Sequence, residues 1–286
     1  MRQVDQIPPL RKVLSQFRSR GERIAFVPTM GNLHQGHLEL VRQAQQRAEQ
    51  VVVSIFVNPT QFGEGEDFES YPRTLERDAR LLREMGVSLL FTPTDTVMYP
   101  DRSLETQDTM WVEVGGLSEV LCGASRPGHF SAVATVVSKL FNMVQPDVAL
   151  FGEKDFQQLL VIHHLVKALD FPVEIVGVPI FREQDGLAMS SRNQYLKATE
   201  RKRATEIYRL LQWMEQQLES GERDFRGLEL SAGKRLQQSD FVLDYLQICN
   251  PQTLQQADHG ENELVILVAA SLGAARLIDN CRVSLR

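Results

Sequence analysis

The feature that most constrains the fold is an alternation of short strand-like runs with helical stretches through the first 180 residues. The strand-like runs are rich in β-branched residues: IAFVP (24–28), VVVSIFV (51–57), SLLFTP (88–93), DVALFG (147–152) and VEIVGVPI (173–180). Between them, apolar residues recur three and four positions apart, as in amphipathic helices, over 38–49, 73–86, 130–144 and 155–170. This alternation predicts an α/β fold with a Rossmann-like, doubly wound parallel sheet.

The pattern changes after about residue 185. Residues 198–222 are predicted to form one long helix, and a second helix is expected near 225–238. Strand-like runs then follow one another without helices between them, over 241–249, 263–273 and 275–281. Such a succession favours antiparallel pairing in a smaller C-terminal α+β domain. We therefore expect two domains, 1–180 and 181–286.

Composition excludes several classes of protein. The formal net charge of -6 argues against a nucleic-acid binder, which needs a basic face to neutralise phosphates. The three cysteines lie far apart, a pattern that fits reduced thiols in the cytoplasm better than disulfides or a zinc site. The N-terminus has no apolar signal region, and no apolar run approaches the roughly 20 residues that span a bilayer. A soluble, cytoplasmic protein without a membrane partner is expected.

Two histidines follow the first predicted strand. His34 and His37 flank Gly36 at the start of the next helix, where unpaired backbone N–H groups and the helix dipole attract anions. Imidazole donors would strengthen a phosphate site, with Gly31 supplying a tight turn. A metal site would need further ligands, and no cysteine or other histidine is near in sequence. A plain loop is the other alternative, and the position favours phosphate.

Polar residues also follow later strands. In NPTQF, Asn58 and Gln61 offer amide groups that suit an acid carrying hydroxyls, although NPTQ is also a good turn sequence. GEKDFQQ begins with Gly152 and is either a ligand-binding segment or a simple helix start. In it, Lys154 can reach phosphate and Asp155 can accept from ribose.

Two further segments carry cationic and hydroxyl groups. Residues 185–196 contain Ser190, Ser191 and Arg192, which suit a triphosphate but also an inter-domain turn. SRPGHF contains Arg126 and His129, which either face a ligand or belong to a helix cap. The acidic stretch 64–70 is expected to be solvated.

Taken together and in this order, these segments closely resemble the pantothenate synthetase (pantoate–β-alanine ligase) family. The likeness runs through PTMGNLHQGH, VNPTQF, YPRT, RPGHF, FGEKDFQQ, DGLAMSSRN and ARLIDN, and so covers essentially the whole chain. HxGH alone would indicate only the wider nucleotidyltransferase superfamily, which includes class I aminoacyl-tRNA synthetases. One departure is Ala132, which stands where the family usually has glycine.

The resemblance implies ATP-dependent condensation of pantoate with β-alanine through a pantoyl adenylate, with release of AMP and pyrophosphate. Domain 1–180 would bind ATP and pantoate, and domain 181–286 would act as a lid. The implied partners are these small molecules, with Mg²⁺ carried by ATP, no metal held by the protein, and a homodimer. Two alternatives are another HxGH adenylyltransferase, acting on a phosphorylated nucleotide, and a non-catalytic ATP-sensing module.

The resemblance also implies roles for individual residues. The catalytic set comprises His34, His37, Lys154, Ser190, Ser191 and Arg192. The ATP site would add Thr29, Met30, Gly31, Gly36, Gly152, Glu153, Asp155, Phe181 and Met189. The site for pantoate and β-alanine would comprise Met30, Asn58, Gln61, Tyr71, Arg126, His129 and Gln158.

Overall fold

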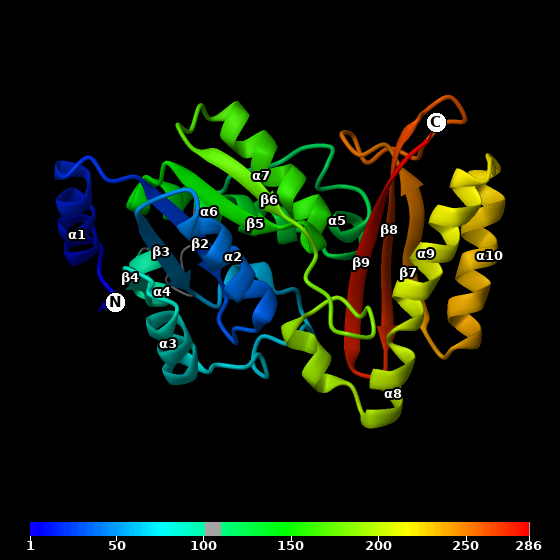
Figure 1. Ribbon diagram of the computed structural model, residues 1–286, viewed down its shortest axis with the longest axis horizontal. Helices are drawn as coiled ribbons and strands as arrows, with labels where there is room; N and C mark the ends of the chain where they lie inside the picture. The colour runs from blue at the N-terminus through cyan, green and yellow to red at the C-terminus, as the bar shows by residue number, and fades with distance from the viewer. Residues whose placement is uncertain (101–109, 286) are drawn as a thin grey trace. The chain divides into compact units, whose positions relative to one another are not determined.

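The computed structural model describes residues 1–100 and 110–285, which divide into two compact units (Figure 1). The larger unit comprises Met1–Glu119, Arg126–Glu153 and Gln158–Pro179. The second comprises Val120–Ser125, Lys154–Gln157 and Ile180–Arg286. Two short segments that precede residue 180 thus belong with the C-terminal part, whereas the expected domains split the chain at a single point.

The larger unit contains the predicted parallel sheet. Its strands are β1 (Arg2–Val4), β2 (Ile24–Thr29), β3 (Gln50–Ile55), β4 (Leu89–Phe91), β5 (Val148–Gly152) and β6 (Glu174–Val178). Their order is β1-β4-β3-β2-β5-β6, and every neighbouring pair is parallel. The doubly wound α/β prediction is confirmed. The three-residue β1 was not predicted, because so short a run has no detectable period.

Helices cover both faces of this sheet. They are α1 (Ile7–Ser19), α2 (Gln35–Gln45), α3 (Leu75–Glu84), α4 (Asp95–Met98), α6 (His129–Val144) and α7 (Phe156–Ala168). Alternate strand residues point to opposite faces. Phe26 accordingly packs in a cluster with α1, α6 and α7, and Val27 packs in another with α2 and α3. Strands buried on both faces explain the nearly continuous apolar run at 51–57.

Loops with predicted site residues leave the sheet at the point where the strand order reverses. β2 lies between β3 and β5, so successive strands proceed in opposite directions from it. Phe26 pairs with Ala149, which puts Thr29 and Gly152 level three residues further along. The loop after β2 and the short helix η2 (Glu153–Asp155) therefore start at the same edge, where ligands of such folds bind.

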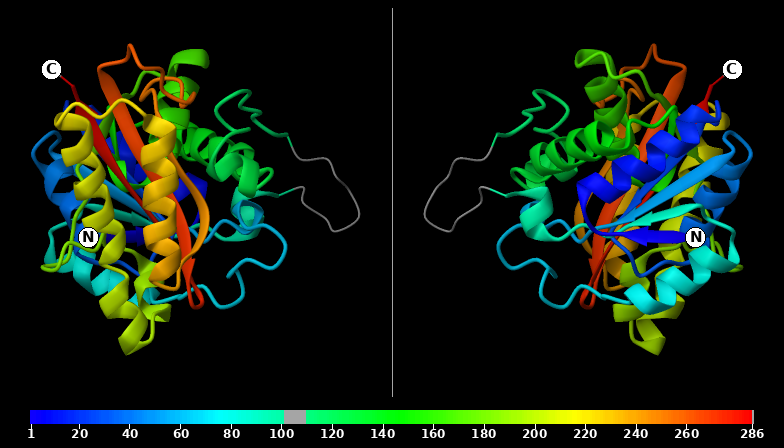
Figure 2. Two further views of the ribbon diagram at one scale, coloured as in Figure 1. Left: turned by 90° about the vertical axis from the view of Figure 1, so that its right-hand side faces the viewer. Right: turned by 90° about the vertical axis from the view of Figure 1, so that its left-hand side faces the viewer.

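The second unit contains a three-stranded antiparallel sheet, as predicted for an α+β region. Its strands are β7 (Val242–Cys249), β8 (Glu263–Leu272) and β9 (Ala275–Ser284), with β8 in the centre. Helices α9 (Glu206–Glu219) and α10 (Phe225–Gln238) lie side by side and pack on this sheet (Figure 2). The four-residue α5 (Cys122–Ser125) also belongs to this unit.

The prediction of one helix over 198–222 was wrong. The segment forms α8 (Ala198–Arg203) and α9, separated at Ala204 and Thr205. The buried Thr205 hydroxyl donates to the Lys202 carbonyl oxygen (2.9 Å). Threonine side chains that bond to nearby backbone in this way compete with regular helical bonding. The apolar period alone does not reveal this interruption.

Candidate functional site

His34 and His37 form a reciprocal cap at the start of α2. The Gly36 N–H donates to His34 Nδ1 (3.2 Å), and the His34 N–H donates to His37 Nδ1 (3.3 Å). The ring centroids are 4.1 Å apart. Because each Nδ1 accepts a hydrogen bond, the proton of each neutral ring must be on Nε2. The cap therefore orients two adjacent imidazoles as Nε2–H donors, which suit phosphate oxygens.

The backbone N–H groups of the preceding turn are already used. Gly31 N donates to Thr29 Oγ1 (3.2 Å), Asn32 N to Asp78 Oδ2 (2.8 Å) and Leu33 N to Asp78 Oδ1 (2.9 Å). Together with the two amides of the histidine cap, five N–H groups have acceptors within the chain. Of the N–H groups at the start of α2, where an anion was expected to bind, those of His34 and Gly36 therefore already have acceptors, and the three of Gly31 to Leu33 precede the helix.

Asn58 directs an unused donor from the end of β3. Its Oδ1 accepts from Tyr99 Oη (2.9 Å) and Thr60 Oγ1 (2.9 Å), which fixes the orientation of the amide. The residue is 1% exposed, and its Nδ2 has no acceptor among the residues that the structure describes. Buried donors of this kind normally bond to a ligand or an ordered water. Asn58 therefore fits an acid with oxygen acceptors.

Arg126 and His129 are brought to Gln61, within η1 (Pro59–Gln61), but through its backbone. His129 Nδ1 lies 2.9 Å from the Gln61 carbonyl oxygen, and Arg126 Nη1 lies 2.9 Å from His129 Nε2. A carbonyl only accepts and a guanidinium only donates, so His129 is the neutral Nδ1–H tautomer. Both of its ring nitrogens are thus occupied in positioning the turn.

Glu66 is the residue of this cluster that the sequence did not predict. Its carboxylate oxygens accept from Arg126 Nε and Nη2, both at 2.6 Å, so the acidic stretch is not simply solvated. Burial raises the pKa of the Glu66 carboxyl, but the hydrogen bonds and charge of Arg126 outweigh burial and hold that pKa below its ordinary value. Tyr71, predicted for the same pocket, is buried with its ring edge-on to Phe62.

The end of β5 has open space beside its last residue. A Cβ built on Gly152 would meet no atom within 4 Å, which leaves room for a ligand against the backbone. Of the two adjacent glutamines, Gln158 is half-buried on α7, as a ligand-binding side chain requires. Gln157 is buried, and its amide bonds to the backbone of Val120 and Cys122 within the second unit.

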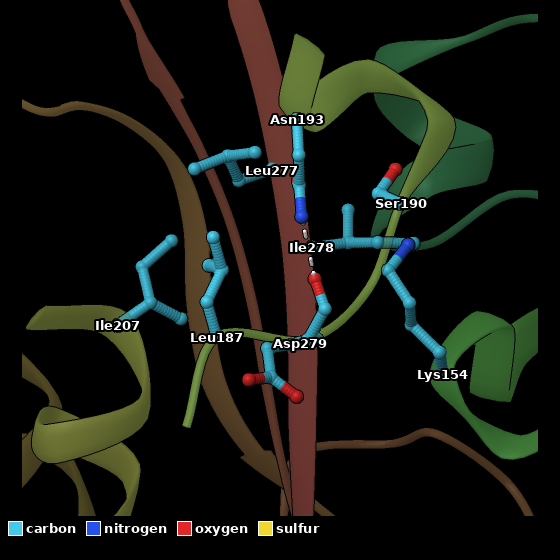
Figure 3. Close-up of a pocket in the computed structure, with 9 residues that line it drawn as sticks. Lys154, Leu187, Ser190, Asn193, Ile207, Leu277, Ile278 and Asp279 are labelled. Carbon is cyan, nitrogen blue, oxygen red and sulfur yellow. Dashed lines mark hydrogen bonds between the residues drawn. The ribbon is translucent and has the colours of Figure 1, made fainter. Parts of the chain in front are cut away.

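Lys154 and Ser190 line one small pocket of the second unit (Figure 3). The Asn193 carboxamide also lines this pocket and donates through Nδ2 to the Ala188 carbonyl oxygen (3.1 Å). Its Oδ1 is buried without a partner among the described residues, and the pocket has room for about one water. Asn280 holds the backbone here, since its Nδ2 donates to the Lys154 carbonyl oxygen (3.1 Å).

Phe181 and Met189, both predicted for the ATP site, lie in segments that are bonded to each other. The Met189 N–H donates to the Phe181 carbonyl oxygen (2.9 Å). The next residue, Arg182, forms a bidentate ion pair with the buried Asp279 of β9, with Nη1–Oδ2 and Nη2–Oδ1 distances of 2.6 and 3.0 Å. Its guanidinium also lies over the Tyr208 ring, 4.1 Å from the centroid. The chain beside Phe181 is thereby fixed to the C-terminal sheet.

The predicted site residues are divided between the two units. The larger unit contains Thr29, Met30, Gly31, His34, Gly36, His37, Asn58, Gln61, Tyr71, Arg126, His129, Gly152, Glu153 and Gln158. The second contains Lys154, Asp155, Phe181, Met189, Ser190, Ser191 and Arg192. Ser191 and Arg192 are half-buried in η3 (Ser191–Tyr195), which Ser190 caps by accepting from Arg192 N (3.3 Å). That both sets act on one nucleotide stays a prediction.

Within residues 1–100 and 110–285, no group of three or more His, Cys, Asp or Glu side chains is arranged to hold a metal ion. Over the same residues, no helix has the length and apolar character needed to cross a membrane. Cys122, Cys249 and Cys281 are free thiols.

Comparisons with known proteins agree over the whole chain. Residues 2–282 match the family model described as pantoate–β-alanine ligase. The pantothenate synthetase of Pseudomonas aeruginosa (strain UCBPP-PA14) is 54% identical over 285 residues, 100% of both chains. That of Shewanella baltica (strain OS185) is 54% identical over 276 residues, 96% of this chain and 97% of its own.

Solved structures give the same result. The pantothenate synthetase of Thermus thermophilus superposes with a TM-score of 0.91 at 47% identity, covering 98% of this chain and 99% of its own. The Francisella tularensis pantoate–β-alanine ligase, complexed with β-γ ATP and β-alanine, has a TM-score of 0.81 at 33% identity. It covers 98% of this chain and 97% of its own.

Proposed function

The chain belongs to the pantoate–β-alanine ligase family, and from this we propose that it condenses pantoate with β-alanine to pantothenate, with cleavage of ATP to AMP and pyrophosphate. A relative solved with an ATP analogue and β-alanine supports these two substrates. The single observation in this chain that carries the nucleotide assignment is the histidine cap, which fixes two Nε2–H donors side by side.

The reaction proceeds in two displacements. A carboxylate oxygen of pantoate attacks the α-phosphorus of ATP, forming pantoyl adenylate as pyrophosphate leaves. The amine nitrogen of β-alanine then attacks the acyl carbon, loses a proton and displaces AMP. Because the substrate carboxylate is itself the nucleophile, the protein needs only to align the substrates and stabilise the charge on the transferring group. His34, His37, Lys154, Ser190, Ser191 and Arg192 are the donors for that charge.

The acid is assigned to the amides after β3 and on α7. Gln61 and Gln158 bind pantoate, and the buried Nδ2 of Asn58 donates to one of its oxygens. Arg126 and His129 contribute by fixing the Gln61 backbone. A module that only sensed ATP would not need these amide side chains. A phosphorylated nucleotide as second substrate would need cationic side chains here, to bind its phosphate.

Four further properties are part of the proposal. Mg²⁺ accompanies the triphosphate, since the donors predicted for it are histidines, cations and hydroxyls rather than a carboxylate cage. Residues 181–286 act as a lid that keeps water from the adenylate.

The enzyme is a homodimer, which sedimentation velocity would test. A cytoplasmic location is supported by the three free thiols, and fractionation of the source cells would test it.

The decisive experiment is an assay for AMP. We expect AMP to form only when ATP, pantoate and β-alanine are all present. Exchange of pyrophosphate into ATP should require pantoate but not β-alanine. His37→Ala should slow adenylate formation by about 10²–10³-fold, because one charge-stabilising donor is lost. AMP formation that does not require pantoate, or activity with a phosphorylated nucleotide in place of pantoate, would contradict the proposal.

A further inference from the structure

Asp78 is a buried carboxylate for which the proposed reaction has no direct use. It lies on α3 and is 0% exposed. Its Oδ1 accepts from Leu33 N (2.9 Å), and its Oδ2 accepts from Asn32 N (2.8 Å) and Thr74 Oγ1 (3.1 Å). Among the described residues it has no ion-pair partner. A carboxylate in such a place is normally costly, and here neutral donors from two segments stabilise it.

The two backbone bonds define the conformation of the turn before the histidines. Asn32 has a φ of 50° and Gly31 a φ of 81°, both in the left-handed region that most residues avoid. The two successive N–H groups bond to different oxygens of the carboxylate, and a carboxamide in the same place would offer one oxygen and one NH₂ donor. The residue after Leu33 is His34, the cap of α2.

Packing leaves the turn little freedom around this carboxylate. A Cβ added to Gly31 would lie 3.2 Å from Asp78 Oδ2 and 3.0 Å from Ile55 Cγ2. The turn therefore lies directly between the end of β3 and α3. A shift of Asp78 must move the turn, and with it the two imidazoles.

We propose that Asp78 is the positioning residue for His34 and His37. It touches no substrate. It fixes the turn so that the histidine cap forms and both Nε2–H groups face the triphosphate, and it keeps two backbone N–H groups from binding phosphate themselves. The inference rests on the proposed function for the role of the two histidines.

The test uses the opposite signs of two effects. Asp78→Asn removes a negative charge next to a phosphate-binding turn, so a purely electrostatic role predicts tighter ATP binding. The positioning role predicts the reverse, because the new NH₂ group faces a backbone N–H. We expect kcat/KM for ATP to fall by about 10- to 100-fold, with the KM for β-alanine unchanged. Glu76→Gln, on the exposed face of the same helix, is the matched control and should leave both constants unchanged.

A spectroscopic measurement separates positioning from general damage. Imidazole ¹⁵N shifts of the wild-type protein should show Nε2–H tautomers for His34 and His37, and Asp78→Asn should give averaged tautomers in a protein that is still folded at the assay temperature. A folded variant with fixed tautomers and wild-type or tighter ATP binding would overturn the inference. If this variant fails to fold, Thr74→Val, which removes one donor to the carboxylate, must raise the Kd for ATP or the inference is wrong.

The failure of the proposed function would look different. ATP affinity measured by calorimetry, with no other substrate, tests Asp78 whether or not pantoate is the acid. A wild-type protein that binds ATP with the expected tautomers but forms no AMP from pantoate and β-alanine would refute the ligase assignment alone.

Discussion

At the scale of the residue, the guanidinium of Arg126 is held on three sides. Its Nε and Nη2 donate hydrogen bonds to the Glu66 carboxylate, and its Nη1 donates to His129 Nε2. The Gln61 carbonyl oxygen lies 3.4 Å from Nη2. Such a bidentate pair is stronger and more directional than a single-contact ion pair. The turn that carries Gln61 is therefore fixed by a charge 60 residues away from Arg126 in sequence.

Glu66→Gln should destabilise the protein at neutral pH and have little effect in acid. The pKa of the Glu66 carboxyl is lowered in the folded state, so its contribution is present above the ordinary value of about 4.5 and is lost as pH falls through the folded pKa. With its partial exposure, we expect a loss of about 1–2 kcal/mol at pH 7. Urea unfolding at pH 7 and at about pH 3, below the lowered pKa, measures it, with the exposed Glu64→Gln as control. Equal stability of wild type and Glu66→Gln at pH 7 would refute this.

Residue types in the segments were enough to predict where polar groups gather, but not how they are held. His34 and His37 were assigned to a helix N-terminus, and the structure places them there. Asp78 and Glu66 were missed because their partners lie 45 to 60 residues away in sequence. One signal was available: Asp78 is spaced four residues from the buried Leu82, an acid within the apolar stripe of a helix.

At the scale of the element, strand β9 anchors two segments that carry predicted ATP contacts. Asp279 pairs with Arg182, beside Phe181, and Asn280 holds the Lys154 carbonyl. Both come from the motif ARLIDN, whose function the residue types alone did not suggest. One strand of the C-terminal sheet thus fixes backbone that is far apart in sequence.

Asp279→Asn should lower the free energy of unfolding by about 2–4 kcal/mol. Asp279 is 4% exposed, so the change leaves the Arg182 guanidinium without its charge partner in a largely buried position. Asp240→Asn removes one partner of the exposed ion pair with Arg203 and should change stability by less than about 0.5 kcal/mol. Urea unfolding of both variants makes the comparison, and similar losses would show that burial does not decide the effect.

Elements with a strong period were predicted well. The runs at 24–28 and 147–152 are strands, and 130–144 is a helix, because burial on one or both faces requires a regular apolar pattern. The helix over 198–222 was wrong because a hydroxyl at Thr205, rather than a break in the apolar stripe, interrupts it. Ala132, which stands where the family usually has glycine, is fully buried within α6.

At the scale of the whole molecule, the change of pattern near residue 180 could be read, but the assignment of two short segments could not. Val120–Ser125 joins the second unit through contacts such as Cys122 Sγ to Tyr245 Oη (3.0 Å). Lys154–Gln157 joins it through Asn280. Both contacts span more than 120 residues, and no local pattern encodes them.

Two thiols should make the protein less stable in alkali. Burial first, and then the carboxylates of Glu229 and Glu215, raise the pKa values of Cys249 and Cys281 to about 12. Their contribution to stability is complete below the ordinary value of about 9 and is lost as pH rises from there toward 12.

Urea midpoints measured from pH 8 to 10.5 should therefore fall more steeply for the wild type than for Cys249→Ala/Cys281→Ala. Parallel slopes for the two proteins would contradict the assignment of raised pKa values.

The saturated turn before His34 has a consequence for inhibitor design. A compound that mimics the anion of P-loop ligands relies on a row of backbone amides, and at Gly31 through His34 those amides are already taken. The complementary group is one that bridges two imidazole donors whose rings are 4.1 Å apart. Compounds chosen for that spacing should discriminate between this enzyme and P-loop kinases, because no substitution within the inhibitor can release amides that the chain itself occupies.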